Sequence, residues 1–338
     1  MATSLSQNPT QGHLQAEITY RRSVLLRSEA HISESDLVIQ EFLNRQSLDP
    51  KQGSHLLGLL HISQANNHIY HFDFSRAREQ LRKWHPSDNE LSEGELRVLC
   101  DQICCNGRIL RGEGRFDEAK VCFEGCLRTP GLPSSKRRLI VSQLADVYCE
   151  LHYATGQIAY LNTAREVVQP EIDSVRACCP HSKALRRLLL SLSEIEIRLG
   201  HHDNAEHLID ELLNIYNILP EPDINDKLGH VRTLIASARI SLPSEAEQRW
   251  RLALLQNKVY NPFEEEVFTC GVIYLFICCI QLGFGDADKG REAFHHAAEV
   301  ICRKRPQYLI PGVGTYLFDF VRQELRSRAG WILSNIAQ

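Results

Sequence analysis

Apolar side chains recur along almost the whole chain at intervals of three and four residues, the period of an α-helix. The pattern begins near Glu17, and no segment sustains the alternation of apolar and polar residues that a half-buried strand requires. Most prolines stand where one periodic segment ends and the next begins. The sequence therefore predicts an all-α protein. Its helices are expected in antiparallel pairs over residues 17–46, 53–85, 92–128, 135–178, 182–218, 226–258 and 264–304.

The two ends of the chain depart from this pattern. Residues 1–15 are polar and predict a disordered segment, followed by a single helical-repeat domain over residues 16–338. Residues 312–335 predict one amphipathic helix. We expect this helix to cap the last pair, because a terminal repeat would otherwise leave an apolar face in water.

One set of small and large residues returns at fixed intervals. The clearest copy consists of Gly107, Gly114, Ala119, Phe123 and Cys126. Further copies are Ser193, Gly200, Ala205, Ile209 and Leu212, and then Cys278, Gly285, Gly290, Phe294 and Ala297. Small residues let two helices approach closely, while Phe123 fills the gap to the next layer. The successive register markers Ala65, Gly107, Ala145 and Ser193 lie about 40 residues apart. Self-similarity of this kind predicts a helical solenoid.

The stretch NGRILRGEGRFDEAKVCFEGCL (106–127) resembles a tetratricopeptide repeat. RLGHHDNAEHLIDELL (198–213) and LGFGDADKGREAFHHAAEV (282–300) are similar but more degenerate. The resemblance implies a right-handed α-solenoid of about seven antiparallel helix pairs with a C-terminal capping helix. The period of about 40 residues is longer than the ~34 of that family. The chain is in this respect similar to divergent, orphan tetratricopeptide-like proteins of fungi.

Composition and charge restrict the partners and the compartment. A net charge of -4 predicts no attraction to nucleic acid. The apolar segment 267–282 is shorter than the ~20 residues of a membrane span, so we expect a buried helix there. The polar opening residues lack the apolar core of a signal peptide, and the 12 cysteines include adjacent pairs unsuited to disulfides. These features predict a cytoplasmic protein with reduced thiols.

Candidate binding residues lie on the first helix of each pair, which should line the concave groove of a solenoid. Counting from the register markers gives Arg108, Arg111, Asp146, Glu150, Glu194 and Arg198, with Arg187 a turn or more earlier and Asn66 and Tyr70 nearer the front. The family resemblance implies that basic and asparagine side chains there can hold a peptide's terminal carboxylate, as Asn66, Arg108 and Arg187 would. The alternative is a network of ion pairs between layers.

Metal and cofactor chemistry is not expected. Four thiols on one hairpin could hold zinc, namely Cys100, Cys104, Cys122 and Cys126, but their positions favour packing. The 15 histidines show no HExxH motif, and Asp286 and Asp288 lack the glycine and glutamate of a calcium loop. The chain contains neither a P-loop nor a nucleophile elbow.

The sequence leaves several functions open. The first is an interaction protein that binds a protein or peptide segment in its groove. The second is a cofactor-free enzyme of natural-product biosynthesis, of the pericyclase or cyclase type. Such an enzyme would hold a small lipophilic ligand bearing a carboxylate or carbonyl, because the groove is expected to be charged in the middle and apolar at both ends. A third is a regulator that senses a small molecule.

Overall fold

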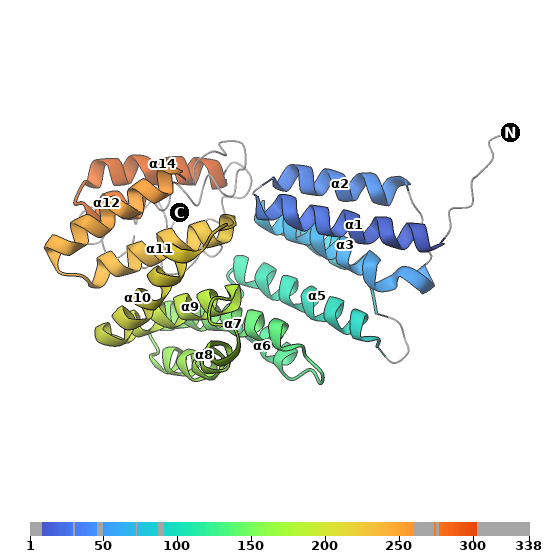
Figure 1. Cartoon of the computed structure of the whole chain (residues 1–338), viewed down its shortest axis with the longest axis horizontal. Helices are drawn as coiled ribbons and strands as arrows, with labels where there is room; N and C mark the ends of the chain where they lie inside the picture. The colour runs from blue at the N-terminus through green and yellow to red at the C-terminus, as the bar shows by residue number, and fades with distance from the viewer. Residues whose placement is uncertain are drawn as a thin grey trace. The chain divides into compact units, whose positions relative to one another are not determined.

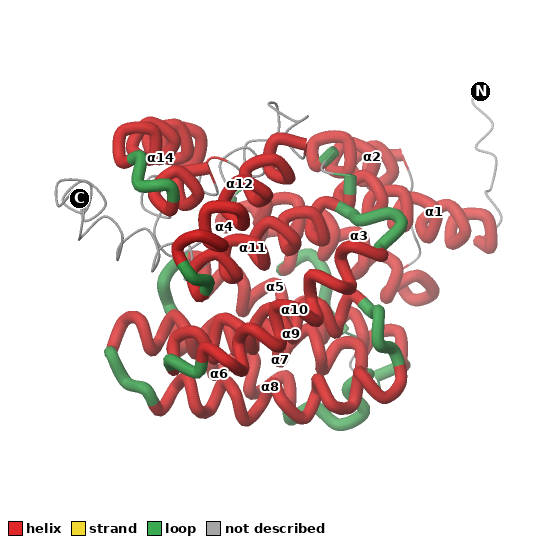
Figure 2. The backbone as a smooth tube through the Cα atoms, turned by 60° about the vertical axis from the view of Figure 1, so that its left-hand side comes forward, coloured by secondary structure: helices red, strands yellow, loops and turns green. Residues whose placement is uncertain are grey.

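The computed structural model describes residues 9–29, 31–45, 50–71, 73–86, 91–259, 274 and 277–302. Every regular element in these ranges is a helix, as Figure 2 shows, so the all-α prediction is confirmed for them. The predicted capping helix 312–335 lies outside the described residues. The chain divides into two compact units, residues Met1–Ile109 and Leu110–Gln338, which are called unit 1 and unit 2 below.

Unit 1 contains two helical pairs and most of a fifth helix (Figure 1). Its helices are α1 (Pro9–Ser28), α2 (Ile32–Arg45), α3 (Pro50–Tyr70), α4 (Phe74–Leu81) and α5 (Glu93–Gly112), the last of which crosses into unit 2. The first three pack together around Ala16, Ile39, Phe42, Leu56 and Leu60. Helix α1 begins at Pro9, within the segment for which we predicted disorder, and residues 1–8 lie outside the described part.

Local sequence explains where α5 begins and why α3 can lie so close to it. Ser92 and Glu95 form a capping box, in which each side chain bonds to the other residue's backbone N–H. Within α3, a Cβ atom at Gly58 would lie 2.5 Å from Val98 of α5 and 2.8 Å from Trp84. The absence of a side chain at Gly58 therefore sets the distance between these elements.

Unit 2 repeats the helical hairpin. After α6 (Phe116–Leu127) come the pairs α7 (Ser134–Thr155) with α8 (Ala159–Cys178), α9 (Lys183–Leu199) with α10 (His202–Ile218), and α11 (Ile224–Ile240) with α12 (Pro243–Val259), and later α14 (Ala287–Cys302). Within this series α7 packs on α9, and α9 packs on α11, so the first helices of successive pairs are neighbours. The described helices agree with the predicted pairs to within a few residues, apart from α1.

The repeated small and large residues have the packing roles that their intervals predict. Ala119, Phe123 and Cys126 are at most 1% exposed in the α6 core. Gly114, Gly200 and Gly285 have φ of 75°, 78° and 81°, a conformation that lets the chain leave one helix and start the next. The predicted helical-repeat fold is confirmed.

The repeat also appears in the sequence separation of contacts between layers. Several polar contacts join residues 40 positions apart, close to the spacing of the register markers. They are Ser23–Ser63 and Arg27–Asn67 in unit 1, and Lys183–Asp223 and Arg186–Asp226 in unit 2. Complementary polar residues one repeat apart therefore link successive layers.

Candidate functional site

Six charged residues on the first helices of unit 2 form a series of ion pairs, which we call the ion-pair ladder. Arg111 of α5 lies 2.8 Å from Asp146 and 3.4 Å from Glu150, both on α7. On α9, Glu194 lies 2.9 Å from Arg198 and 3.4 Å from Arg239 of α11. Each guanidinium in the ladder has a carboxylate partner, and the three positive charges balance three negative ones.

The opposite charges of the ladder stabilise one another. Burial by itself would lower the pKa of Arg111, but Asp146 and Glu150 raise it above its ordinary value. The side chains of Glu150 and Glu194 are only 6% and 5% exposed, so these carboxylates depend on their arginine neighbours. The ladder therefore has the arrangement of a structural link between layers, which was the alternative interpretation of these residues.

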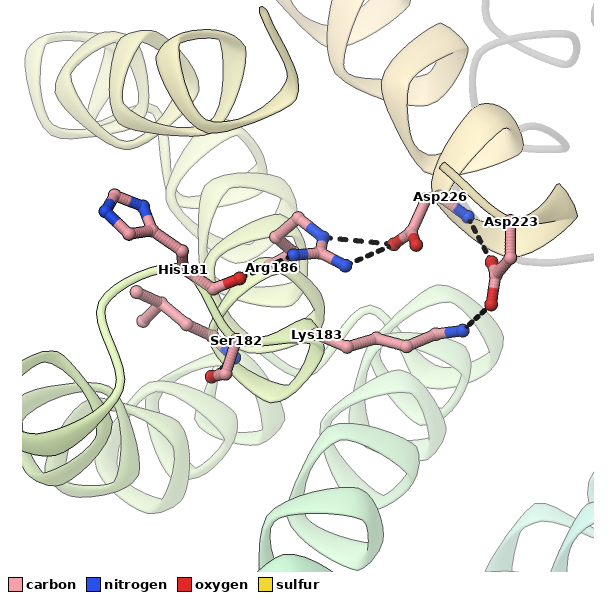
Figure 3. Close-up of polar contacts among 7 residues, drawn as sticks. His181, Ser182, Lys183, Arg186, Asp223 and Asp226 are labelled. Carbon is pink, nitrogen blue, oxygen red and sulfur yellow. Dashed lines mark hydrogen bonds and ion pairs between the residues drawn. The ribbon is translucent and has the colours of Figure 1, made fainter. Parts of the chain in front are cut away.

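Two further ion pairs join α9 to the start of α11, as Figure 3 shows. Arg186 donates two hydrogen bonds to one oxygen of Asp226, at 2.8 and 3.0 Å, and Lys183 bonds to Asp223. Asp223 also caps α11 by accepting from the backbone N–H of Asp226. Burial would raise the pKa of Asp223, yet the bonds from Lys183 and the backbone lower it overall. These charges are likewise neutralised within the fold.

A different arrangement occurs in unit 1, where Arg27 of α1 and Arg108 of α5 form what we call the arginine cluster. Nη1 of Arg27 donates to the backbone oxygen and hydroxyl of Ser63, at 3.1 and 2.8 Å, and to the side-chain oxygen of Asn67 at 2.9 Å. Nη1 of Arg108 donates to the side-chain oxygen of Asn66 at 2.5 Å. Its guanidinium carbon lies 5.7 Å from the centre of the Tyr70 ring. All of these partners are neutral.

Neither arginine of the cluster forms an ion pair with any described residue. Arginine has five N–H donors, and the bonds above involve only Nη1 of each side chain. Nε and Nη2 of both residues therefore donate to no described group. A guanidinium binds a carboxylate or phosphate through two parallel N–H groups.

The electrostatics of the cluster differ from those of the ladder. Burial lowers the pKa of Arg27, and the like charge of Arg108 lowers it further, whereas the pKa of Arg111 is raised. Burial also raises the pKa of Cys105, beside both arginines, to about 11, so this thiol is neutral at physiological pH. Arginine does not give up its proton in proteins. The cluster is thus a half-buried positive site without a counter-ion among the described residues.

The predicted site residues fall into three groups. Asn66, Tyr70 and Arg108 come together in the arginine cluster, where Asn66 also donates to the backbone oxygen of Ile62 and holds Arg108 in place. The ladder contains Arg111, Asp146, Glu150, Glu194 and Arg198. Arg187 is exposed on α9 and has no hydrogen bond or ion pair among the described residues.

Sequence reasoning missed Arg27, Ser63 and Asn67. The segment around Arg27 carries no recognisable copy of the repeated residues, and therefore gave no register from which to place its side chain. The contact between Arg27 and Asn67 spans 40 residues, so the repeat spacing itself was the signal that could have found it.

Within the described ranges, no three His, Cys, Asp or Glu side chains gather as metal ligands. Among the described cysteines all are free thiols; Cys178 and Cys179 are exposed, while Cys122 is half-buried and the others are buried. None of the helices over the described residues combines the length and the apolar character of a bilayer span.

Comparisons with known proteins give matches in structure. No protein-family model matches the chain, and no curated protein matches its sequence. A Rap protein complexed with Competence and Sporulation Factor is 13% identical with a TM-score of 0.56, covering 94% of this chain and 87% of that one. BtubC (BKLC) from P. vanneervenii is 13% identical with a TM-score of 0.44, covering 72% of this chain and 91% of that one. At such identity the Rap likeness shows the fold alone. The chain accordingly has a tetratricopeptide-like helical-repeat fold.

Proposed function

We propose that this protein binds a segment of a partner protein or a peptide, and that an acidic group of the segment occupies the arginine cluster. The observation that carries the proposal is the contrast between two sets of arginines. Those of the ladder are neutralised by carboxylates of the fold, whereas Arg27 and Arg108 have only neutral partners. A ligand carboxylate would supply the missing counter-ion.

The neighbouring groups support recognition of a carboxylate. A 2.5 Å hydrogen bond to Asn66 orients Arg108, and the guanidinium carbon lies 5.7 Å from the centre of the Tyr70 ring. Ser63 and Asn67 fix one nitrogen of Arg27 and leave its other donors available. A preorganised guanidinium loses little entropy when it binds an anion. The acidic group could be a C-terminal carboxylate or an Asp or Glu side chain.

The similarity in fold is consistent with binding. The Rap protein with this kind of fold was crystallised in complex with Competence and Sporulation Factor. None of the contacts described above favours the cyclase alternative, which requires an enclosed and mostly apolar cavity around the polar groups. The similarity to tetratricopeptide-like proteins of fungi, which was inferred from the sequence, stays a prediction.

Fluorescence polarisation with the full chain tests the proposal. The probes are fluorescein-labelled pentapeptides of varied sequence, each made with a free C-terminal carboxylate and with a C-terminal amide. We expect binding of acidic peptides that weakens about tenfold or more, or ~1.4 kcal/mol, in Arg108→Met. Loss on amidation identifies the C-terminus as the anchor, whereas retention identifies an acidic side chain. The matched control is Arg251→Met, which removes an exposed arginine of α12 that pairs with Glu247. Binding that is equal in wild type, Arg108→Met and Arg27→Met would contradict the proposal.

A further inference from the structure

Helix α1 leaves several large apolar side chains outside the core of unit 1, although Tyr20 packs against that core. The residues of α1 that are buried are small or polar, namely Ala16, Thr19 and Ser23. By contrast, Leu14, Ile18 and Leu25 are 60%, 48% and 57% exposed. Positions 14, 18 and 25 lie on one side of a helix because they are four and seven residues apart. Helix α1 thus presents an apolar strip of Leu14, Ile18 and Leu25 to solvent.

Helix α2 also carries an exposed apolar side chain. Leu37 is 55% exposed, and its neighbour Val38 lines a groove between α1 and α2. Together α1 and α2 carry five of the eleven large hydrophobic side chains that are exposed among the described residues. Single exposed apolar residues are ordinary, but a contiguous group of them marks an interaction surface.

A groove of about 260 Å³ runs between these two helices. It is lined by Gln15, Ile18, Thr19, Arg22, Val38, Glu41, Phe42 and Arg45. All of these residues belong to α1 and α2, and none belongs to α3, which packs on the other side of the pair. The groove therefore opens on the outer face of the first hairpin. We call this surface, with the groove and the exposed leucines, the α1–α2 face.

The charges that border the groove have both signs. Arg22 of α1 is exposed and forms no ion pair with a described residue. Glu41 of α2 is exposed and lies 3.7 Å from Arg45, one turn further along the same helix. A face that holds an arginine on one wall and a glutamate on the other is complementary to itself when rotated by 180°.

We propose that the α1–α2 face binds the same face of a second copy of this chain. In this fold the outer face of one hairpin is covered by the next hairpin, and a second α1–α2 hairpin is a surface of that type. A two-fold axis through the groove brings Ile18 of each copy toward Val38 and Phe42 in the groove of the other. The same axis brings Arg22 of each copy next to α2 of its partner, where Glu41 lies. This proposal is independent of ligand binding at the arginine cluster.

Sedimentation velocity on the full chain at several concentrations tests the proposal. We expect wild type to be a dimer and Ile18→Asp to be a monomer with an unchanged helical circular dichroism spectrum. The matched control is Val121→Asp, which places a charge at a 60% exposed apolar position of α6. It should remain a dimer. A charge exchange tests the pairing: Arg22→Glu and Glu41→Arg should each weaken the dimer at least tenfold, and the double variant should restore it.

Several outcomes would overturn the proposal. A wild-type chain that sediments as a monomer at all concentrations up to ~100 μM does not form the proposed dimer at those concentrations. A dimer that survives Ile18→Asp uses another surface. If Val121→Asp dissociates the dimer as readily as Ile18→Asp, the α1–α2 face is not its specific interface.

Discussion

Arg108 donates a 2.5 Å hydrogen bond to the side-chain oxygen of Asn66, and this neutral group is its hydrogen-bond partner among the described residues. One turn later on the same helix, Arg111 lies between two carboxylates of α7. Helix α5 thus carries two arginines with different roles. Arg111 links layers of the repeat, whereas Nε and Nη2 of Arg108 donate to no described group and under the proposed function would bind an anion.

Removing Arg111 should destabilise the protein strongly. Arg111→Met takes away the guanidinium beside Asp146 and Glu150, which are 26% and 6% exposed, and leaves their charges poorly compensated. We expect a loss of about 2–4 kcal/mol in the free energy of unfolding. Urea denaturation followed by circular dichroism measures it. The matched control is Arg97→Met, because the Arg97–Glu93 pair is 56% and 76% exposed. It should change stability by less than about 0.5 kcal/mol. Equal losses in the two variants would show that the ladder has no special structural role.

Gly58 should not tolerate a methyl group. A Cβ atom there would lie 2.5 Å from Val98, closer than packed atoms approach, so α3 and α5 would have to separate. Gly58→Ala should cost about 1–3 kcal/mol in thermal or urea unfolding. Gly125 of α6 is the control, since nothing lies within 4 Å of its added Cβ. Gly125→Ala should stabilise by up to about 1 kcal/mol through helix propensity. Stabilisation by both substitutions would contradict the close approach described here.

His230 should make the fold less stable in mild acid. Burial lowers the pKa of His230 in the folded state, so the unfolded chain binds the proton more readily. Its contribution is therefore complete above the unfolded pKa of ~6.5 and is lost as pH falls toward the folded value. His230 stacks on Tyr216 with ring centres 5.1 Å apart, an arrangement that phenylalanine can keep.

The measurement is the fall in unfolding midpoint between about pH 7.5 and about pH 5.5. His230→Phe should show a smaller fall than wild type. Some dependence should remain, because burial also lowers the pKa of His61 and His68. An undiminished fall in His230→Phe would mean that His230 does not take up a proton on unfolding.

The sequence was sufficient to predict the helices and their register, because close packing demands small residues at fixed intervals. Counting from Gly107, Ala145 and Ser193 predicted that Arg111 and Glu150 face the groove or pair between layers, and the structure joins them in an ion pair. Counting residues from the register markers could not identify the partner of each charged side chain. Whether an arginine is neutralised depends on the side chains of the next layer, about 40 residues away.

The arginine cluster is a second case in which the sequence alone could not identify the contacts of a side chain. Arg108 and Asn66 were predicted as ligand residues; the structure joins them to each other, and in the proposed site Asn66 would orient Arg108. Arg27 was missed because the repeated residues are not recognisable in α1. Its small and polar buried residues, such as Ser23, depart from the usual apolar stripe of a core-facing helix.

The central claim is that the arginine cluster binds an anion, and a phosphate titration at constant ionic strength measures it most directly. The readout is the thermal unfolding midpoint of wild type, Arg27→Met and the control Arg251→Met. We predict that inorganic phosphate at ten times its dissociation constant stabilises wild type and Arg251→Met by about 1.4 kcal/mol relative to chloride. Arg27→Met should lose that gain. A gain in Arg27→Met equal to that of wild type would contradict anion binding at Arg27 and Arg108.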